Sequence, residues 1–166
     1  MCGTAARADP FGGRSLRISA GVVRPEAVGT AAWLGIGVRV RFLGVWLEPE
    51  AGYWSRHETA FGLQSSVRDV HAGANAQWAL LRHGPARLLA AAGASAHGVT
   101  SSGGPLGGAS AAETHVYPGL QGWLSFELRL GERSAAFVGG RGDWILRGSR
   151  EDEQEMRLFG GIRLGF

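Results

Sequence analysis

The feature that most limits how this chain can fold is a strict alternation of apolar with polar or small residues. It is clearest in the last twelve residues, EMRLFGGIRLGF, where one side carries Met156, Leu158, Ile162, Leu164 and Phe166. The other side carries arginines, glycines and a phenylalanine. Side chains alternate between the two faces of a β-strand, so this pattern predicts a strand with one apolar face. Because the last residue still follows the pattern, we expect the strand to reach the end of the chain.

Seven further segments show the same alternation. We expect strands over residues 15–24, 31–42, 45–56, 69–82, 86–98, 114–130 and 133–146. The segment 86–98 is the weakest of them, because its run of alanines would also suit a helix. Together with the terminal segment, these strands predict an all-β chain.

The links between the segments alternate in length. Tight links fall around residues 43–44, 83–85 and 131–132, and longer links at 25–30, 57–68, 99–113 and 147–154. The link 99–113 is rich in glycine and serine, so we expect it to be mobile. Turns at one rim and loops at the other predict an eight-stranded antiparallel up-and-down β-barrel. We expect the barrel domain over 14–166 and a flexible N-terminal segment over 1–13.

The polar faces of the strands indicate which side of the barrel is apolar. They carry glycine, amide and aromatic residues with isolated arginines and glutamates, unlike the densely charged face of a soluble barrel. Glycines make room for large neighbours inside a narrow barrel, and isolated opposite charges can pair there. We therefore expect a transmembrane barrel with lipid outside and a lumen filled by side chains. The expected polar network of the lumen comprises Arg39, Glu48, Glu127, Arg141, Arg157 and Arg163.

Other interpretations of the same pattern remain open. A small soluble barrel of the lipocalin kind would turn the apolar face inward and bind an apolar ligand. An ordinary soluble sandwich would bury the aromatic residues near the strand ends, whereas a membrane barrel would place them at its two interfaces. These aromatic residues are Tyr53, Trp78, Trp144 and Phe166.

The distribution of charge and the lack of a visible targeting signal bear on which classes of function the sequence supports. All 17 basic residues are arginines, and they are spread along the chain, so we expect no nucleic-acid surface. No stretch of apolar residues is long enough for a transmembrane helix. No secretory signal peptide is visible, so we expect an exported form to be a mature or truncated chain.

The chain resembles the eight-stranded outer-membrane β-barrels of Gram-negative bacteria, a class that includes the transmembrane domain of OmpA and OmpX. The resemblance rests on the terminal strand that ends in Phe166 and on the phrase LEPEAGYW at 47–54. It implies an outer-membrane location, contact with outer-membrane lipid and lipopolysaccharide, and insertion by the barrel-assembly machinery. In that class the terminal strand is the signal for this machinery, which implies Ile162, Leu164 and Phe166 as recognition positions.

A structural or surface-interaction role is expected from this resemblance, with the protein as a monomer. Arginines in or directly beside the longer links can pair with lipopolysaccharide phosphates, because a guanidinium binds phosphate through two hydrogen bonds. The arginines in question are Arg56, Arg68, Arg147 and Arg150.

Catalysis has little support in the sequence. The lipid A deacylases of the class that this chain resembles carry a His-x-Ser pair near the end of the chain. The last two segments of this chain contain no such pair. No Gly-x-Ser-x-Gly motif is present either. We therefore expect neither an enzyme nor a cofactor. The alternative is a hydrolase or metal site at the loop rim that acts on outer-membrane lipid.

Three histidines form the candidate metal site. If the link between the fourth and fifth segments centres on Gly84, His71 pairs with His97. If the next link centres near Leu106, His97 pairs in turn with His115. Three imidazoles at cross-strand distance can bind zinc or another divalent metal. The alternative is that all three are polar lumen residues that bond to water and neighbouring amides.

Overall fold

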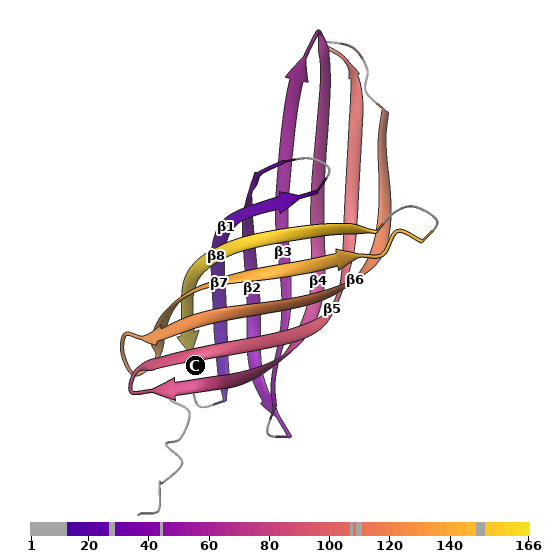
Figure 1. Ribbon diagram of the computed structural model, residues 1–166. Helices are drawn as coiled ribbons and strands as arrows, with labels where there is room; N and C mark the ends of the chain where they lie inside the picture. The colour runs from indigo at the N-terminus through magenta and orange to yellow at the C-terminus, as the bar shows by residue number, and fades with distance from the viewer. Residues whose placement is uncertain (1–12, 27–28, 44, 107, 109–110, 149–151) are drawn as a thin grey trace, which may run out of the picture.

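The strands of this protein form one closed sheet. The structure, a computed structural model, describes residues 13–26, 29–43, 45–106, 108, 111–148 and 152–166. Neighbouring strands pair antiparallel around the ring, which confirms the expected eight-stranded up-and-down β-barrel (Figure 1). The strands are β1 (Arg14–Pro25), β2 (Ala31–Phe42), β3 (Val45–Ala60), β4 (Leu63–His83), β5 (Ala86–Pro105), β6 (Ala111–Arg129), β7 (Ser134–Ile145) and β8 (Glu153–Gly165). Within the described ranges, no helix has the length and apolar character needed to cross a membrane.

The terminal strand closes the ring by pairing with the first. The β1–β8 ladder runs from Ser15↔Gly165 to Pro25↔Glu155. Beyond it, the backbone N–H of Phe166 donates to the carbonyl oxygen of Arg14 at 3.4 Å. Closure pairs both edges that an open meander would leave exposed. Of the expected N-terminal segment 1–13, all but the last residue lies outside the described residues.

The outward-facing side chains form an apolar belt around the barrel. Exposed fractions are 49% for Ile36, 55% for Leu124 and 45% for Ile162. Charged residues alternate with them on the buried face, as the sequence predicts. This arrangement is the inverse of a soluble barrel, so the alternative with an apolar, lipocalin-like interior is wrong. The other exposed belt residues include Leu34, Val38, Phe126, Leu128 and Leu164.

Four strands extend further than the sequence pattern indicates. β3, β4, β5 and β6 have 16, 21, 20 and 19 residues, against 12 or 13 for the other strands. They rise together above the short β7 and β8 as a wall of sheet (Figure 1). The expected loops 57–68 and 99–113 are therefore wrong over most of their length. The alternation ends because both faces of this wall carry polar residues, while the backbone pairing continues.

A two-residue turn replaces the expected long link between β3 and β4. Phe61 and Gly62 make this turn with φ angles of 52° and 74°. A positive φ at both positions suits a tight hairpin whose twist matches the flanking strands. Phenylalanine is unusual in such a turn, which is why the sequence did not reveal it.

The alanine-rich segment is a strand throughout. β5 pairs with β4 on one side and with β6 on the other along its length. Pairing on both sides outweighs the helix preference of alanine, because each residue gains partners in the sheet that a helix here would forfeit. The helical alternative for 86–98 is therefore wrong.

Candidate functional site

The barrel interior nearer the short turns holds a set of charged residues that we call the lower group. Glu48 contacts Nη1 of Arg163 at 2.8 Å and Nε of Arg17 at 2.9 Å. Glu127 contacts Nε of Arg163 at 2.8 Å and Nη2 of Arg87 at 2.9 Å. Glu48 therefore bridges two arginines, and Glu127, which also lies 3.7 Å from Arg39, contacts three. The members of the lower group are Arg17, Arg39, Arg87, Arg163, Glu48 and Glu127.

The interior nearer the tall wall holds a second set, the upper group. Arg141 donates to both oxygens of Asp143, at 2.9 and 2.8 Å, and also to Glu50. Arg157 lies 2.7 Å from Glu155 and 3.4 Å from Asp143. β7 and β3, which carry Arg141 and Glu50, are opposite walls of the ring, so this pair crosses the lumen. The members are Arg141, Arg147, Arg157, Glu50, Asp69, Asp143, Glu153 and Glu155.

Glycines make room for the large rings between these charges. A Cβ at Gly52 would lie 2.2 Å from Cε1 of His71 and 2.8 Å from Nε1 of Trp33. A Cβ at Gly139 would lie 2.8 Å from Cζ of Phe159. The lumen at these levels is therefore packed side chain against side chain. Its aromatic members are Trp33, Trp54, Trp123, Phe137 and Phe159.

All six residues expected in the polar network lie inside the barrel and are buried. They are Arg39, Glu48, Glu127, Arg141, Arg157 and Arg163. Several of their partners were missed from the sequence, although a signal was present. Glu50 lies two positions from Glu48, and Glu155 lies two positions from Arg157, so each shares a strand face with an expected member. Arg17, Asp69 and Asp143 follow the same rule on their own strands.

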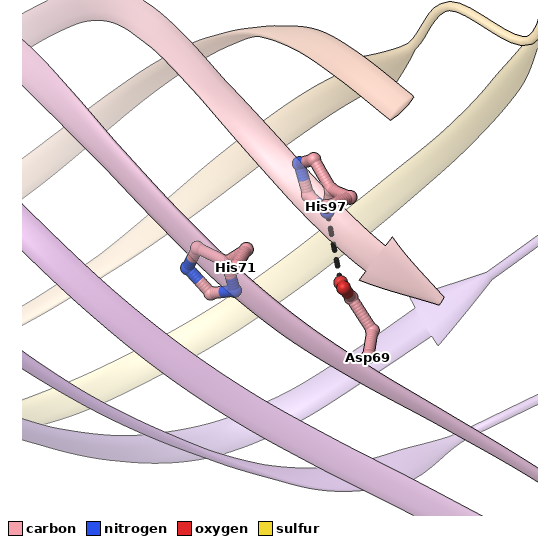
Figure 2. Close-up of side chains that lie close together, drawn as sticks. All are labelled: Asp69, His71 and His97. Atoms are coloured by element: carbon pink, nitrogen blue, oxygen red, sulfur yellow. Dashed lines mark hydrogen bonds and ion pairs between the residues drawn. The ribbon is translucent and has the colours of Figure 1, made fainter. Parts of the chain in front are cut away.

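Two of the three candidate histidines lie together. His71 on β4 pairs in register with His97 on β5, as predicted, and their rings stack at 5.4 Å between centroids. Asp69, also on β4, accepts a hydrogen bond from Nδ1 of His97 at 2.8 Å (Figure 2). All three residues are fully buried, and each offers a ligand atom within 4.8 Å of the others. The cluster is thus a carboxylate with two imidazoles.

The prediction that His115 belongs to this cluster is wrong. His97 pairs with Tyr117, and His115 pairs with Val99, because the β5–β6 hairpin centres one residue later than expected. A shift of one residue in the centre moves each partner by two positions along the strand. His115 is consequently higher in the wall, with a side chain that is 54% exposed and 3.7 Å from Glu113. Asp69 takes its place as the third member.

The hydrogen bonds around His97 have the order found in serine hydrolases. Asp69 bonds to Nδ1, and the hydroxyl of Ser95 lies 3.0 Å from Nε2. A hydrolase needs its hydroxyl exposed to substrate. Ser95, however, is buried and lies on the far side of His97 from the rim of the barrel. The arrangement therefore orients His97 and presents no accessible nucleophile.

A pocket of about 240 Å³ opens at the rim above the cluster. Its wall includes Trp54 and Tyr117, together with three glutamates. The guanidinium of Arg147 stacks 5.3 Å from the Tyr117 ring and bonds to Glu153. Val67 and Val99 also line the pocket, and each is two positions from a cluster residue on the same strand. The pocket floor thus adjoins the cluster.

The three residues expected to guide assembly face outward on or just after β8. Their exposed fractions are 45% for Ile162, 40% for Leu164 and 65% for Phe166. In the closed barrel all three side chains are therefore exposed on its outer surface. Their role as a recognition signal stays a prediction.

The chain is similar in structure to several known proteins, but no match was found by sequence. No protein-family model matches the chain, and no curated protein matches it. Neisserial surface protein A superposes with a TM-score of 0.76 at 14% identity, covering 92% of this chain and 97% of that one. A major outer membrane protein of Thermus thermophilus has a TM-score of 0.63 at 10% identity, covering 92% and 99%. Ail, the attachment invasion locus protein of Yersinia pestis, solved with the heparin analogue sucrose octasulfate, has a TM-score of 0.55 at 11% identity, covering 92% and 97%.

These similarities show that the chain has the fold of eight-stranded transmembrane β-barrels. The apolar belt and the charged interior described above agree with that fold.

Proposed function

We propose that this protein resides in the bacterial outer membrane and has a structural or surface-interaction role, with a lumen closed to large solutes. Two of the similar structures are a surface protein and a major outer membrane protein, which supports the location. The proposal has two parts, a closed lumen and an interacting wall.

The observation that carries the proposal is the set of contacts that cross the lumen. Arg141 on β7 bonds to Glu50 on β3, the opposite wall of the ring. Arg157 on β8 lies 3.1 Å from His71 on β4, again opposite. Arg163 and Glu48 join β8 to β3 at 2.8 Å nearer the short turns. Contacts at three levels support a lumen without a continuous wide channel.

Bilayer recordings test the closed lumen. We expect the unaltered protein to show no stable conductance of large hydrated solutes. Removing a crossing pair with the double variant Glu50→Ala, Arg141→Ala should raise ion leakage. Glu58→Ala, which changes an exposed residue of the wall, should not. Stable conductance of large solutes by the unaltered protein would contradict the proposal.

The wall of β3 to β6 is the proposed interacting surface. It rises above the barrel, and its tip carries Phe61 and Leu106, which are 104% and 60% exposed. A raised sheet with apolar residues at its tip presents a contact surface away from the membrane.

Lipopolysaccharide is the proposed contact at the base of this wall. Arg56 is bonded to the carbonyl of Thr30 and to Glu58, and Arg147 is bonded to Glu153. Arg150 lies outside the described residues. Arg68 is exposed and shares the outer face of β4 with the belt residue Val70, which suits a phosphate at the membrane interface.

Binding to vesicles tests this contact. Arg68→Ser should lower the retention of the protein on vesicles that contain lipopolysaccharide, relative to vesicles of phospholipid alone. Arg82→Ser is a matched control, because Arg82 is exposed at the other end of the same strand. Equal effects of the two variants would contradict a specific phosphate contact.

Insertion by the barrel-assembly machinery and a monomeric state belong to the same proposal. The outward placement of Ile162, Leu164 and Phe166 on the closing strand supports the first. Closure of the ring within one chain supports the second, because no strand edge of the barrel proper awaits a partner within the described ranges.

A further inference from the structure

We infer that Asp69, His71 and His97 bind one zinc ion in the lumen, beneath the rim pocket. The cluster offers two imidazole nitrogens and one carboxylate oxygen within 4.8 Å of one another. Zinc accepts this donor set with three protein ligands and one further position, whereas magnesium and calcium prefer oxygen alone. The inference is independent of the closed lumen and of the interacting wall.

Small movements are enough to form the site. Zinc bonds of about 2.0–2.1 Å at a tetrahedral angle place two ligand atoms about 3.3 Å apart. Asp69 Oδ2 and His97 Nδ1 are 2.8 Å apart, so a slight opening admits the ion between them. The third bond comes from a ring nitrogen of His71, which lies within 4.8 Å of the ligand atoms of Asp69 and His97, so a small shift of its side chain is sufficient.

Ser95 is placed to orient His97 toward the ion. Its hydroxyl lies 3.0 Å from Nε2, on the opposite side of the ring from Asp69. With zinc on Nδ1, the proton resides on Nε2, and the hydroxyl oxygen of Ser95 accepts it in a hydrogen bond. Such a bond to the second ring nitrogen is the usual support of a metal-binding histidine.

One oxygen of the cluster has no hydrogen-bond partner within the described part of the chain. Asp69 is fully buried, and its Oδ1 has none there. A buried carboxylate oxygen that has lost its water is destabilising unless something replaces that water. A cation at the cluster would do so, which is a second observation that points to a bound ion.

The charge of the surrounding interior also favours a divalent cation. The upper group has five carboxylates against three arginines, and one of the five, Glu50, also bonds to Arg17 of the lower group, so one negative charge remains in surplus. The cluster lies in the upper group, where negative charge is in surplus when the histidines are neutral. A cation there is attracted by this surplus, and the low dielectric constant of the interior strengthens the attraction.

Arg157 is the resident cation with which zinc must compete. Its Nη1 lies 3.1 and 3.2 Å from the ring nitrogens of His71, and its Nη2 lies 3.9 Å from Asp69. Glu155 and Asp143 also contact this guanidinium, at 2.7 and 3.4 Å, so it keeps two carboxylate partners when the ion displaces it from His71. Removing this guanidinium should therefore tighten zinc binding.

Entry is through the rim pocket. Val67 and Val99 line the pocket, and the next inward residues on their strands are Asp69 and His97. Trp54, which also lines it, pairs in register with Asp69. The open position of the zinc ion thus faces the pocket.

Zinc titration of the full barrel refolded in detergent, with a chromophoric chelator as competitor, tests the inference. We expect one tight site per chain. His71→Gln and His97→Gln should weaken it by more than about tenfold. His83→Gln changes an exposed histidine at the short-turn end of β4, away from the rim pocket, and should leave it unchanged. Arg157→Gln should tighten it, an effect that zinc bound to surface histidines would not show.

X-ray absorption at the zinc edge of the unaltered protein gives a test that needs no variant. Two imidazoles and oxygen in the zinc shell are expected. No tight site, a shell with fewer than two imidazoles, or loss of binding in His83→Gln would overturn the inference. Heat-modifiable gel migration of each variant verifies that the barrel has formed, and if one histidine variant does not fold, Asp69→Asn supplies the same comparison.

Discussion

Glu48 is the residue whose replacement best tests how the interior charges stabilise the barrel. Glu48→Gln keeps the size and shape of the side chain and removes its charge. Glu48 is fully buried and holds Arg163 at 2.8 Å and Arg17 at 2.9 Å. Without it, two buried guanidiniums each lose a carboxylate partner.

The expected loss of stability follows from what each arginine retains. Removing one partner of a buried ion pair typically costs about 3–5 kcal/mol. Arg163 still has Glu127 at 2.8 Å, and Arg17 still has Glu50. The loss should therefore lie near the lower end, at about 3 kcal/mol, which lowers the folding equilibrium constant by about a hundredfold.

Equilibrium unfolding in urea, with the barrel folded in lipid vesicles, measures this loss. The matched control is Glu58→Gln, because Glu58 also pairs with an arginine, Arg56, at 2.6 Å but is 51% exposed. Exposed pairs contribute about 0–1 kcal/mol, so the control should stay close to the unaltered protein. If the two variants lost similar amounts, the interior would be solvated like the surface, and the reasoning would be refuted.

Three further predictions concern packing, membrane depth and assembly. Gly52→Ala should destabilise the barrel by about 1–3 kcal/mol in the same unfolding assay, because the added Cβ would lie 2.2 Å from the His71 ring. Gly142→Ala should be tolerated, because the atom nearest to its added Cβ is 3.7 Å away. Leu124→Arg should lower the free energy of unfolding in vesicles by about 2–4 kcal/mol. Val116→Arg, which lies higher on the same face of β6, should lower it by about 0–1 kcal/mol. Equal losses would place the wall inside the bilayer. Deleting Phe166 should reduce insertion in cells far more than refolding in detergent, because one ring contributes only about 1.5–3 kcal/mol by burial; equal effects in both assays would remove the recognition role.

The sequence alone determines which side chains face inward and where the short turns lie. Alternation places Arg39, Glu48 and Arg141 on the face opposite the belt, and the structure buries all three. It also locates the turn that brings His71 opposite His97. Both predictions work because the side-chain period of a strand is fixed by the backbone, so one apolar face identifies the other.

The alternation of apolar and polar residues no longer predicts strand length and register where neither face of a strand is apolar. Above the belt, β3 to β6 have mainly polar residues on both faces, so residues 57–68 and 99–113 were predicted to be loops. For the same reason the β5–β6 register was misplaced by one residue at the turn, and His115 was grouped with His97 in place of Asp69. A strand without an apolar face is held by its neighbours alone, and only the paired structure reveals its length and register.

Contacts across the lumen are decided by the tertiary structure. Nothing in the sequence connects Arg141 with Glu50 or Arg157 with His71, which come from opposite walls. Which side chains meet there depends on how far each strand is staggered against the next, summed around the whole ring. Alternation determines what enters the lumen, and closure of the barrel determines what it contacts there.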